Sequence, residues 1–148
     1  MKNERDTFTI LMVDDDDEDC MLTQDALRES RLNNPIEFVR DGVELMAYLR
    51  QEGDYKHARR PGLILLDLNM PRKDGREALM EIKADPRLRS IPVVILTTSK
   101  SETDVLRSYD LGANSYITKP ITFQALVDVM LVLGRYWFEI VELPDAEQ

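Results

Sequence analysis

Short apolar runs alternate five times with segments whose apolar residues recur at helical spacing, and this alternation limits the fold more than any other feature of the chain. A strand followed by a helix, repeated in this way, implies one parallel sheet with helices on both faces. The expected strands are Phe8–Val13, Pro35–Val39, Gly62–Asp67, Pro92–Thr97 and Ser115–Thr118. The expected helices are Asp19–Arg31, Asp41–Gln51, Asp74–Asp85, Ser101–Gly112 and a last one from near Thr122 to about Trp137.

The expected strands are nearly continuous apolar runs, which is typical of strands covered on both faces. In open sheets of this type, the ligand site lies beyond the carboxyl ends of the strands, where the strand order reverses. The residues that follow each strand are therefore the candidates for function.

Polar side chains stand at four of these five strand ends. Asp14 and Asp15 follow the first strand, Asp67 ends the third, Thr97 ends the fourth, and Lys119 follows the fifth. If the strand order is 2-1-3-4-5, the first and third strands are neighbours, and the three aspartates converge.

Three carboxylates in one cleft repel one another, and a divalent cation removes that cost. A few carboxylates together with water suit Mg²⁺, which often binds a phosphate oxygen as well. Lys119 supplies a positive charge and Thr97 a hydroxyl donor, as a phosphoryl group requires. A carboxylate can also act as a nucleophile toward phosphorus. We therefore predict that Asp67 is phosphorylated.

Each of these residues also has a structural interpretation. The run Asp14–Asp19 alone could be a solvated loop that caps the next helix, and Asp67 alone could be a turn residue. Thr97 and the pair Lys119–Pro120 carry little information by themselves. The joint placement of all of them at strand ends favours a site.

Composition excludes several classes of protein. The chain has 148 residues, which fits one domain, and a net charge of −9, which argues against nucleic acid as the main partner. The single cysteine, Cys20, excludes an internal disulfide, and the single histidine, His57, lies in a polar segment and is expected at the surface. Neither a signal sequence nor an apolar run of membrane-spanning length is present, so we expect a soluble, cytoplasmic protein.

Four motifs, in this order, resemble the receiver domains of two-component response regulators: the "DD" pair after a strand, "LLDLNMPRKDG", "VVILTTS" and "SYITKP". The resemblance covers Phe8 to about Trp137 and implies a flavodoxin-like (βα)5 fold. It implies one receiver domain over residues 1–148, with a core of about 8–137, an extension at 138–148 and no DNA-binding output domain. The expected output is a protein contact or a further relay step.

The resemblance also assigns roles to individual residues. It implies Asp67 as the phosphoryl acceptor, with Asp14, Asp15 and the backbone carbonyl of Asn69 as further metal ligands. It also implies Thr97 and Lys119 as the phosphoryl-sensing pair, Tyr116 as an aromatic switch residue, and a cis peptide at Pro120.

A narrower resemblance points to the small response regulators that serve bacterial, especially cyanobacterial, phytochromes. The matching segments are "QEGDYKHARRPGLILLDLNMP", "DGREALMEIKADPRLRSIPVVILTTS" and "YWFEIVELP". The implied partner is a sensor histidine kinase, a phytochrome. Two departures matter: the acidic run Asp14–Asp17 could admit Mn²⁺ and other divalent cations, and the bulky Thr98 could slow attack of water on the phosphoryl group.

Two other functions remain as alternatives. The "DDDD" run contains the acid-x-acid arrangement of Mg²⁺-dependent phosphatases that form an aspartyl-phosphate, but that class places its nucleophile on the first strand. A receiver-like module that is never phosphorylated is disfavoured, because every site residue is present. We therefore expect a signalling domain and no separate enzyme activity.

The last helix carries more apolar residues than one face of a sheet can cover. Phe123, Leu126, Val127, Met130 and Leu133 form one stripe, which we expect against the core. Val129, Val132, Tyr136 and Ile140 form a second stripe. Either the tail Phe138–Leu143 folds back over it, or it is the interface of a homodimer, which we predict.

Overall fold

The computed structural model describes residues 8–32 and 34–140, with only the backbone described for 138–140. The strands are β1 (Ile10–Val13), β2 (Ile36–Val39), β3 (Leu63–Leu66), β4 (Val93–Thr97) and β5 (Ser115–Thr118). The helices are α1 (Asp17–Glu29), α2 (Gly42–Leu49), α3 (Gly75–Ala84), α4 (Glu102–Asp110) and α5 (Phe123–Leu133). A short 3₁₀-helix covers Gly53–Tyr55, and a π-helix, Gly134–Ile140, continues α5.

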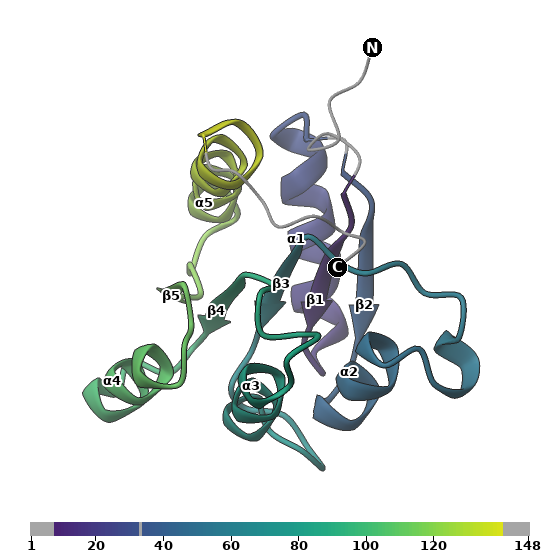
Figure 1. Ribbon diagram of the computed structural model, residues 1–148. Helices are drawn as coiled ribbons and strands as arrows, with labels where there is room; N and C mark the ends of the chain where they lie inside the picture. Colours follow the sequence, from purple (N-terminus) through teal and green to yellow (C-terminus); the bar gives the residue numbers. More distant parts are fainter. Residues whose placement is uncertain (1–7, 33, 141–148) are drawn as a thin grey trace.

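All five strands are parallel, in the order β2-β1-β3-β4-β5, which confirms the predicted sheet (Figure 1). Helices α1 and α5 cover one face, and α2, α3 and α4 cover the other (Figure 1). The order reverses between β1 and β3, where the register pairs Val13 with Leu66. The residues that follow these two strands therefore emerge side by side.

Alternation along the strands divides the apolar interior into two layers. On β1, Leu11 and Val13 face the layer under α2 and α3, whereas Ile10 and Met12 face the layer under α1 and α5. Both layers are filled with aliphatic side chains from strands and helices, so the sheet is a stiff platform for the residues at its carboxyl edge.

Polar side chains fix where the helices begin. Asp16 accepts hydrogen bonds from the amides of Glu18 and Asp19, so α1 begins at Asp17, two residues before the predicted start. Asp41 caps α2 as predicted, accepting from the amide of Glu44. Part of the acidic run Asp14–Asp19 therefore caps α1, as its structural interpretation predicts.

The two apolar stripes of α5 are only partly as predicted. Leu126, Val127, Met130 and Leu133 are buried, but Phe123 is 42% exposed and does not belong to that stripe, because it lies in the first turn of α5. In the second stripe, Val132 and Tyr136 are exposed, whereas Val129 packs against the core. The side chain of Ile140 and most of the tail Phe138–Leu143 lie outside the described residues.

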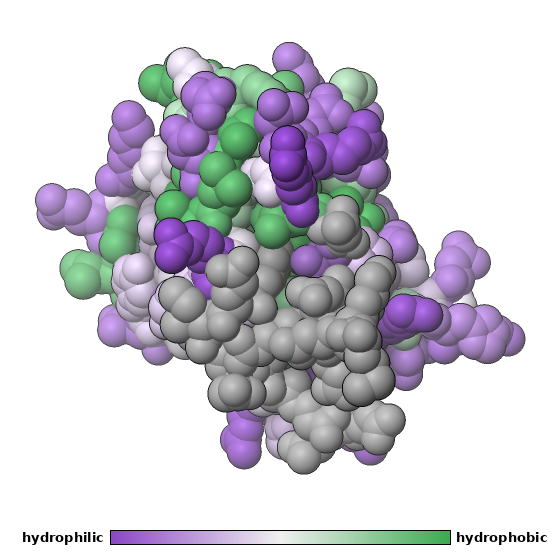
Figure 2. Space-filling model, turned by 90° about the horizontal axis from the view of Figure 1, so that it is seen from above, coloured by the Kyte–Doolittle hydropathy of each residue, from purple (hydrophilic) through white to green (hydrophobic). Residues whose placement is uncertain are grey.

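Hydrophobic residues are exposed on the side of the molecule formed by α1 and α5, among hydrophilic ones (Figure 2). No helix in the described part of the chain is long and apolar enough to cross a bilayer.

Candidate functional site

The carboxyl ends of β1 and β3 bring three aspartates together. Asp14 and Asp15 follow β1 directly, and Asp67 follows β3. One carboxylate oxygen from each lies within 4.8 Å of the others. Asp14 and Asp67 are buried, whereas Asp15 is exposed. The cluster is therefore anchored on two stiff strands and opens to solvent on the Asp15 side.

Lys119 reaches this cluster from the far side of the sheet, after β5. Its Nζ lies 2.7 Å from Oδ2 of Asp14, 2.7 Å from Oδ2 of Asp19 and 3.2 Å from Oδ2 of Asp67. An ammonium group has three N–H donors, so each can face one carboxylate. Lys119 is thus fully engaged by acids, and one of them, Asp19, was not expected at the site.

Burial and pairing act in opposite directions on these groups. Burial raises the pKa of Asp14 to about 6, although its hydrogen bond with Lys119 lowers it. Burial lowers the pKa of Lys119, but its bonds with Asp14 and Asp19 outweigh this and raise that pKa above its usual value. The lysine therefore stays charged, while Asp14 holds its negative charge at a cost.

Thr97, at the end of β4, is fully buried, and its hydroxyl oxygen has no hydrogen-bond partner among the described residues. A buried hydroxyl left in this way costs about 1–3 kcal/mol. The cost is removed if a ligand oxygen accepts from this hydroxyl. Thr97 is the orphaned polar group that an oxygen-rich ligand at the strand ends would complete.

The loop after β3 is held close to Asp67. The amide of Asn69 donates to Oδ1 of Asp67 over 3.3 Å, and the amide of Gly75 donates to the carbonyl oxygen of Leu68 over 3.0 Å. A Cβ at Gly75 would lie 2.2 Å from the carbonyl oxygen of Asp67. Only glycine lets the start of α3 come this close to the acidic cluster.

The loop after β4 is held by a hydrogen-bond network that the sequence did not reveal. Arg76 on α3 makes a two-pronged ion pair with Asp104 on α4, at 2.7 and 2.8 Å. Ser99 donates to the same carboxylate over 2.6 Å. These bonds with Arg76 and Ser99 lower the pKa of Asp104 to about 2. No local motif marks these partners, because each pair joins separate elements.

Tyr116, the predicted switch residue, joins that network. Its hydroxyl donates to the carbonyl oxygen of Ser99 over 2.9 Å, and its half-buried ring packs against the core under α2 and α3. Tyr116 therefore touches the loop that begins beside Thr97.

The predicted cis peptide at Pro120 is contradicted, because the described residues contain no cis peptide bond. Trans is the preferred isomer before proline by about 0.5–1 kcal/mol, and Lys119 reaches the aspartates without the cis form. Two other expectations agree with the structure: His57 is exposed, and Cys20 is a free thiol.

The donor set fits a hard divalent cation. Three carboxylates with one exposed member leave room for water, which Mg²⁺ retains when it binds. The excess negative charge, only partly balanced by Lys119, favours a cation. The backbone carbonyl of Asn69 follows Asp67 closely in the chain, and its role as a ligand stays a prediction.

A doubly wound sheet whose switch point carries acids, a lysine and an unsatisfied hydroxyl defines a flavodoxin-like protein with an acidic site suited to a divalent cation. The family model for the response regulator receiver domain matches residues 10–131. The chain therefore belongs to the receiver-domain family of response regulators. Receiver domains bind Mg²⁺ or Mn²⁺ at such an acidic pocket.

The chain is similar to two response regulators, Rcp1 and RcpA. The chain is 47% identical to response regulator Rcp1 of Synechocystis over 137 residues, which is 93% of each protein. It resembles the crystal structure of the phosphorylated cyanobacterial phytochrome response regulator RcpA, with a TM-score of 0.89 and 49% identity, covering 94% of this chain and 99% of that one. It also resembles the Mn²⁺-bound form of Rcp1, with a TM-score of 0.86 and 46% identity, covering 93% and 99%.

Proposed function

We propose that this response regulator accepts a phosphoryl group on Asp67 from a sensor histidine kinase. The observation that carries the proposal is the bond of Lys119 to Asp67, beside two further aspartates and the unpartnered hydroxyl of Thr97. The positive charges of Lys119 and of a bound metal ion, together with the hydroxyl donor of Thr97, suit a phosphoryl group, which bears about two negative charges.

In the transfer, an oxygen of the Asp67 carboxylate forms a bond to phosphorus, and the bond from phosphorus to the donor histidine nitrogen breaks. The electron pair of the broken bond stays on that nitrogen, which takes a proton from solvent. Lys119 balances charge on the phosphoryl oxygens, and the hydroxyl of Thr97 donates a hydrogen bond to one of them. A bound Mg²⁺ or Mn²⁺, held by Asp14, Asp15, Asp67 and the carbonyl of Asn69, supplies further charge neutralisation there.

The signal leaves the site through the loop after β4. When Thr97 moves to bond the phosphoryl group, the carbonyl of Ser99, which accepts from Tyr116, shifts with it. Tyr116 then changes its position, and the surface of α4, β5 and α5 repacks. This is a two-state switch biased by a local change in charge.

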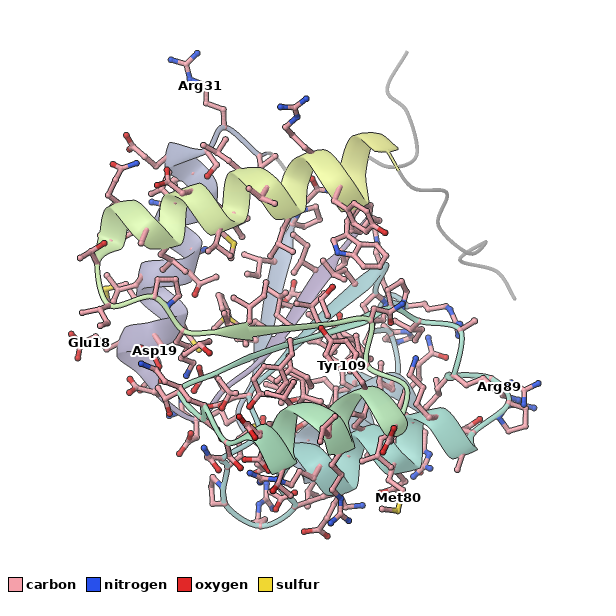
Figure 3. The ribbon with its side chains drawn as sticks, turned by 90° about the vertical axis from the view of Figure 1, so that its left-hand side faces the viewer. Glu18, Asp19, Arg31, Met80, Arg89 and Tyr109 are labelled. Atoms are coloured by element: carbon pink, nitrogen blue, oxygen red, sulfur yellow. The ribbon has the colours of Figure 1, made fainter. Side chains whose placement is uncertain are left out.

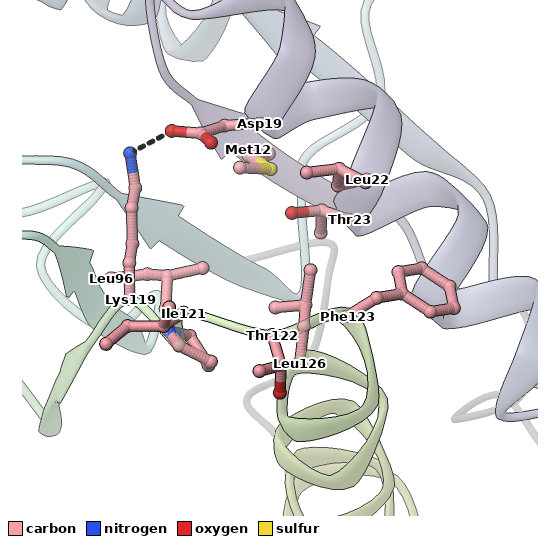
Figure 4. A pocket seen from close by; sticks show the side chains of 11 residues that line it. Met12, Asp19, Leu22, Thr23, Leu96, Lys119, Ile121, Thr122, Phe123 and Leu126 are labelled. Carbon is pink, nitrogen blue, oxygen red and sulfur yellow. Dashed lines mark hydrogen bonds and ion pairs between the residues drawn. The ribbon is translucent and has the colours of Figure 1, made fainter.

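The surface beside Lys119 suits the kinase that must deliver the phosphoryl group. Lys119 lines a pocket of about 100 Å³ between α1 and the start of α5 (Figure 4). Around it, Ile121 is 96% exposed, and Leu22 and Phe123 are also exposed. A donor protein that reaches Asp67 must lie against this rim. Leu22, Ile121 and Phe123 gather around one pocket there, and apolar side chains grouped in this way favour a protein contact.

The partner we propose is a phytochrome kinase, because RcpA, which is 49% identical to this chain, is a cyanobacterial phytochrome response regulator. The experiment is transfer of labelled phosphate from each histidine kinase of the same genome to the protein. We expect the phytochrome kinase to label it fastest. Ile121→Ser should slow that transfer while leaving labelling by acetyl phosphate unchanged. Faster labelling by an unrelated kinase would contradict the partner assignment but not the acceptor.

Three further expectations belong to this proposal. Residues 1–148 form one receiver domain with an extension from 138, the output is a protein contact, and the protein works in the cytoplasm. A homodimer through α5 and the tail is supported by the exposure of Val132 and Tyr136. Val129 is less suited to that interface, because it packs against the core.

A further inference from the structure

Asp19 is the partner of Lys119 that neither a metal ion nor a phosphoryl group requires. It lies in the first turn of α1, half-buried, with Oδ2 at 2.7 Å from the lysine nitrogen (Figure 4). The cluster of oxygens that could hold a metal contains Asp14, Asp15 and Asp67, but not Asp19. Asp19 therefore binds the lysine but takes no part in metal binding or phosphoryl transfer.

The other two partners of Lys119 change during phosphorylation. On the proposed function, Asp14 turns to the cation and Asp67 becomes the acyl phosphate, so each can release its N–H donor. The bond to Asp19 is the one that can persist. A lysine has four flexible methylene groups, and holding its end in one place costs side-chain entropy. A permanent partner removes that cost before the phosphoryl group arrives.

We propose that Asp19 is a positioning residue that anchors the Lys119 ammonium beside the acceptor while its other partners are exchanged. The inference rests on the proposed function. It assigns to α1 a direct part in phosphoryl sensing, through a side chain on the rim of the pocket next to the site.

The anchor and a simple charge effect have opposite consequences. If Asp19 acted only through its negative charge, removing it would strengthen binding of an anion nearby. If Asp19 anchors Lys119, removing Asp19 weakens binding of the anion. The free lysine side chain must then be ordered when the anion binds, and the entropy it loses reduces the binding free energy. The sign of the change therefore separates the two.

The experiment measures the affinity of beryllium fluoride, which mimics a phosphoryl group on an aspartate, at saturating Mg²⁺. We expect Asp19→Ala to weaken it roughly three- to tenfold, as loss of one ordering hydrogen bond does. Asp19→Asn keeps an oxygen acceptor and should lose less. In nitrogen NMR, the Lys119 ammonium signal should be sharp in the parent protein and broadened by fast proton exchange in Asp19→Ala.

The matched control is Glu18→Gln, which removes the same charge from the same turn of α1. Glu18 is exposed, its side chain makes no hydrogen bond or ion pair within the described ranges, and it lies at the outer edge of α1 (Figure 3). It should bind beryllium fluoride like the parent protein. Unchanged or tighter binding by folded Asp19→Ala would overturn the anchor. No binding by the parent protein would instead refute the proposed function.

Discussion

The ammonium nitrogen of Lys119 lies 3.2 Å from Oδ2 of Asp67, although 52 residues separate them in the chain. The contact exists because both residues follow strands of one parallel sheet and so reach the same edge. On the proposed function, this bond is one that phosphorylation of Asp67 changes. Activation must therefore exchange partners around the lysine.

Lys119→Ala tests that exchange. The variant should still accept phosphate from acetyl phosphate, but slowly, and it should not switch. Without the Lys119 ammonium group, Asp14 and Asp67 are buried acids that lack their charged partner. The metal-free variant should therefore lose roughly 3–5 kcal/mol of unfolding free energy. Partner binding after phosphorylation, together with urea unfolding, checks both outcomes. Normal phosphorylation-dependent binding would contradict the role.

Asp15→Ala tests the metal site. Asp15 is exposed and belongs to the acidic cluster, so its removal should abolish Mg²⁺ binding and phosphorylation while the fold stays intact. The metal-free variant should be as stable as its parent or more stable, because one member of a repelling group is gone. Calorimetric titration with Mg²⁺ and thermal melting measure these effects. A metal-free variant that melts several degrees lower would oppose this account.

The ion pair of Asp104 with Arg76 should make stability depend on pH. The pKa of Asp104 is lowered to about 2 from 3.8, so its contribution is present above pH 4 and is lost as the pH falls toward 2. We expect Asp104→Asn to be about 1–2 kcal/mol less stable at pH 7, allowing for solvent screening, and to approach the stability of the parent as the pH falls through 2.

The control for that measurement is Glu102→Gln, which removes an exposed acid from the same turn of α4. It should show no such difference across the pH range. A constant destabilisation of Asp104→Asn from pH 7 to pH 2 would show that the ion pair does not carry the effect.

The double variant Val132→Glu with Tyr136→Glu tests the homodimer. Both side chains are exposed, at 67% and 47%, so glutamates there should split a dimer through α5 without unfolding the protein. The matched control is Val43→Glu with Met80→Glu, which alters exposed apolar residues on the other face of the sheet. Sedimentation at micromolar protein, with and without beryllium fluoride, distinguishes the states. A monomer in both conditions would rule out the dimer.

The fold and the core of the site follow from local patterns. The apolar runs predicted all five strands, and parallel topology then placed Asp14, Asp15 and Asp67 together, as the structure shows. Helix starts were accurate to about two residues, because capping side chains such as Asp16 fix them.

What could not be predicted depends on contacts between distant elements. Asp19 meets Lys119 across 100 residues, and Arg76 meets Asp104 across 28, with no periodicity to mark either pair. The acidic run did contain a signal for Asp19, since it lies in the first turn of the helix that follows Asp14 and Asp15. Phe123 was misassigned because helical spacing identifies a stripe but not where the sheet beneath it ends.

Phosphorylation of Asp67 is the central claim, and mass spectrometry tests it most directly. The protein is treated with acetyl phosphate and Mg²⁺, and the modified peptide is identified. The parent protein should gain one phosphoryl group on the peptide that contains Asp67, and Asp67→Asn should gain none. Labelling of Asp67→Asn to the same extent as the parent would contradict the account.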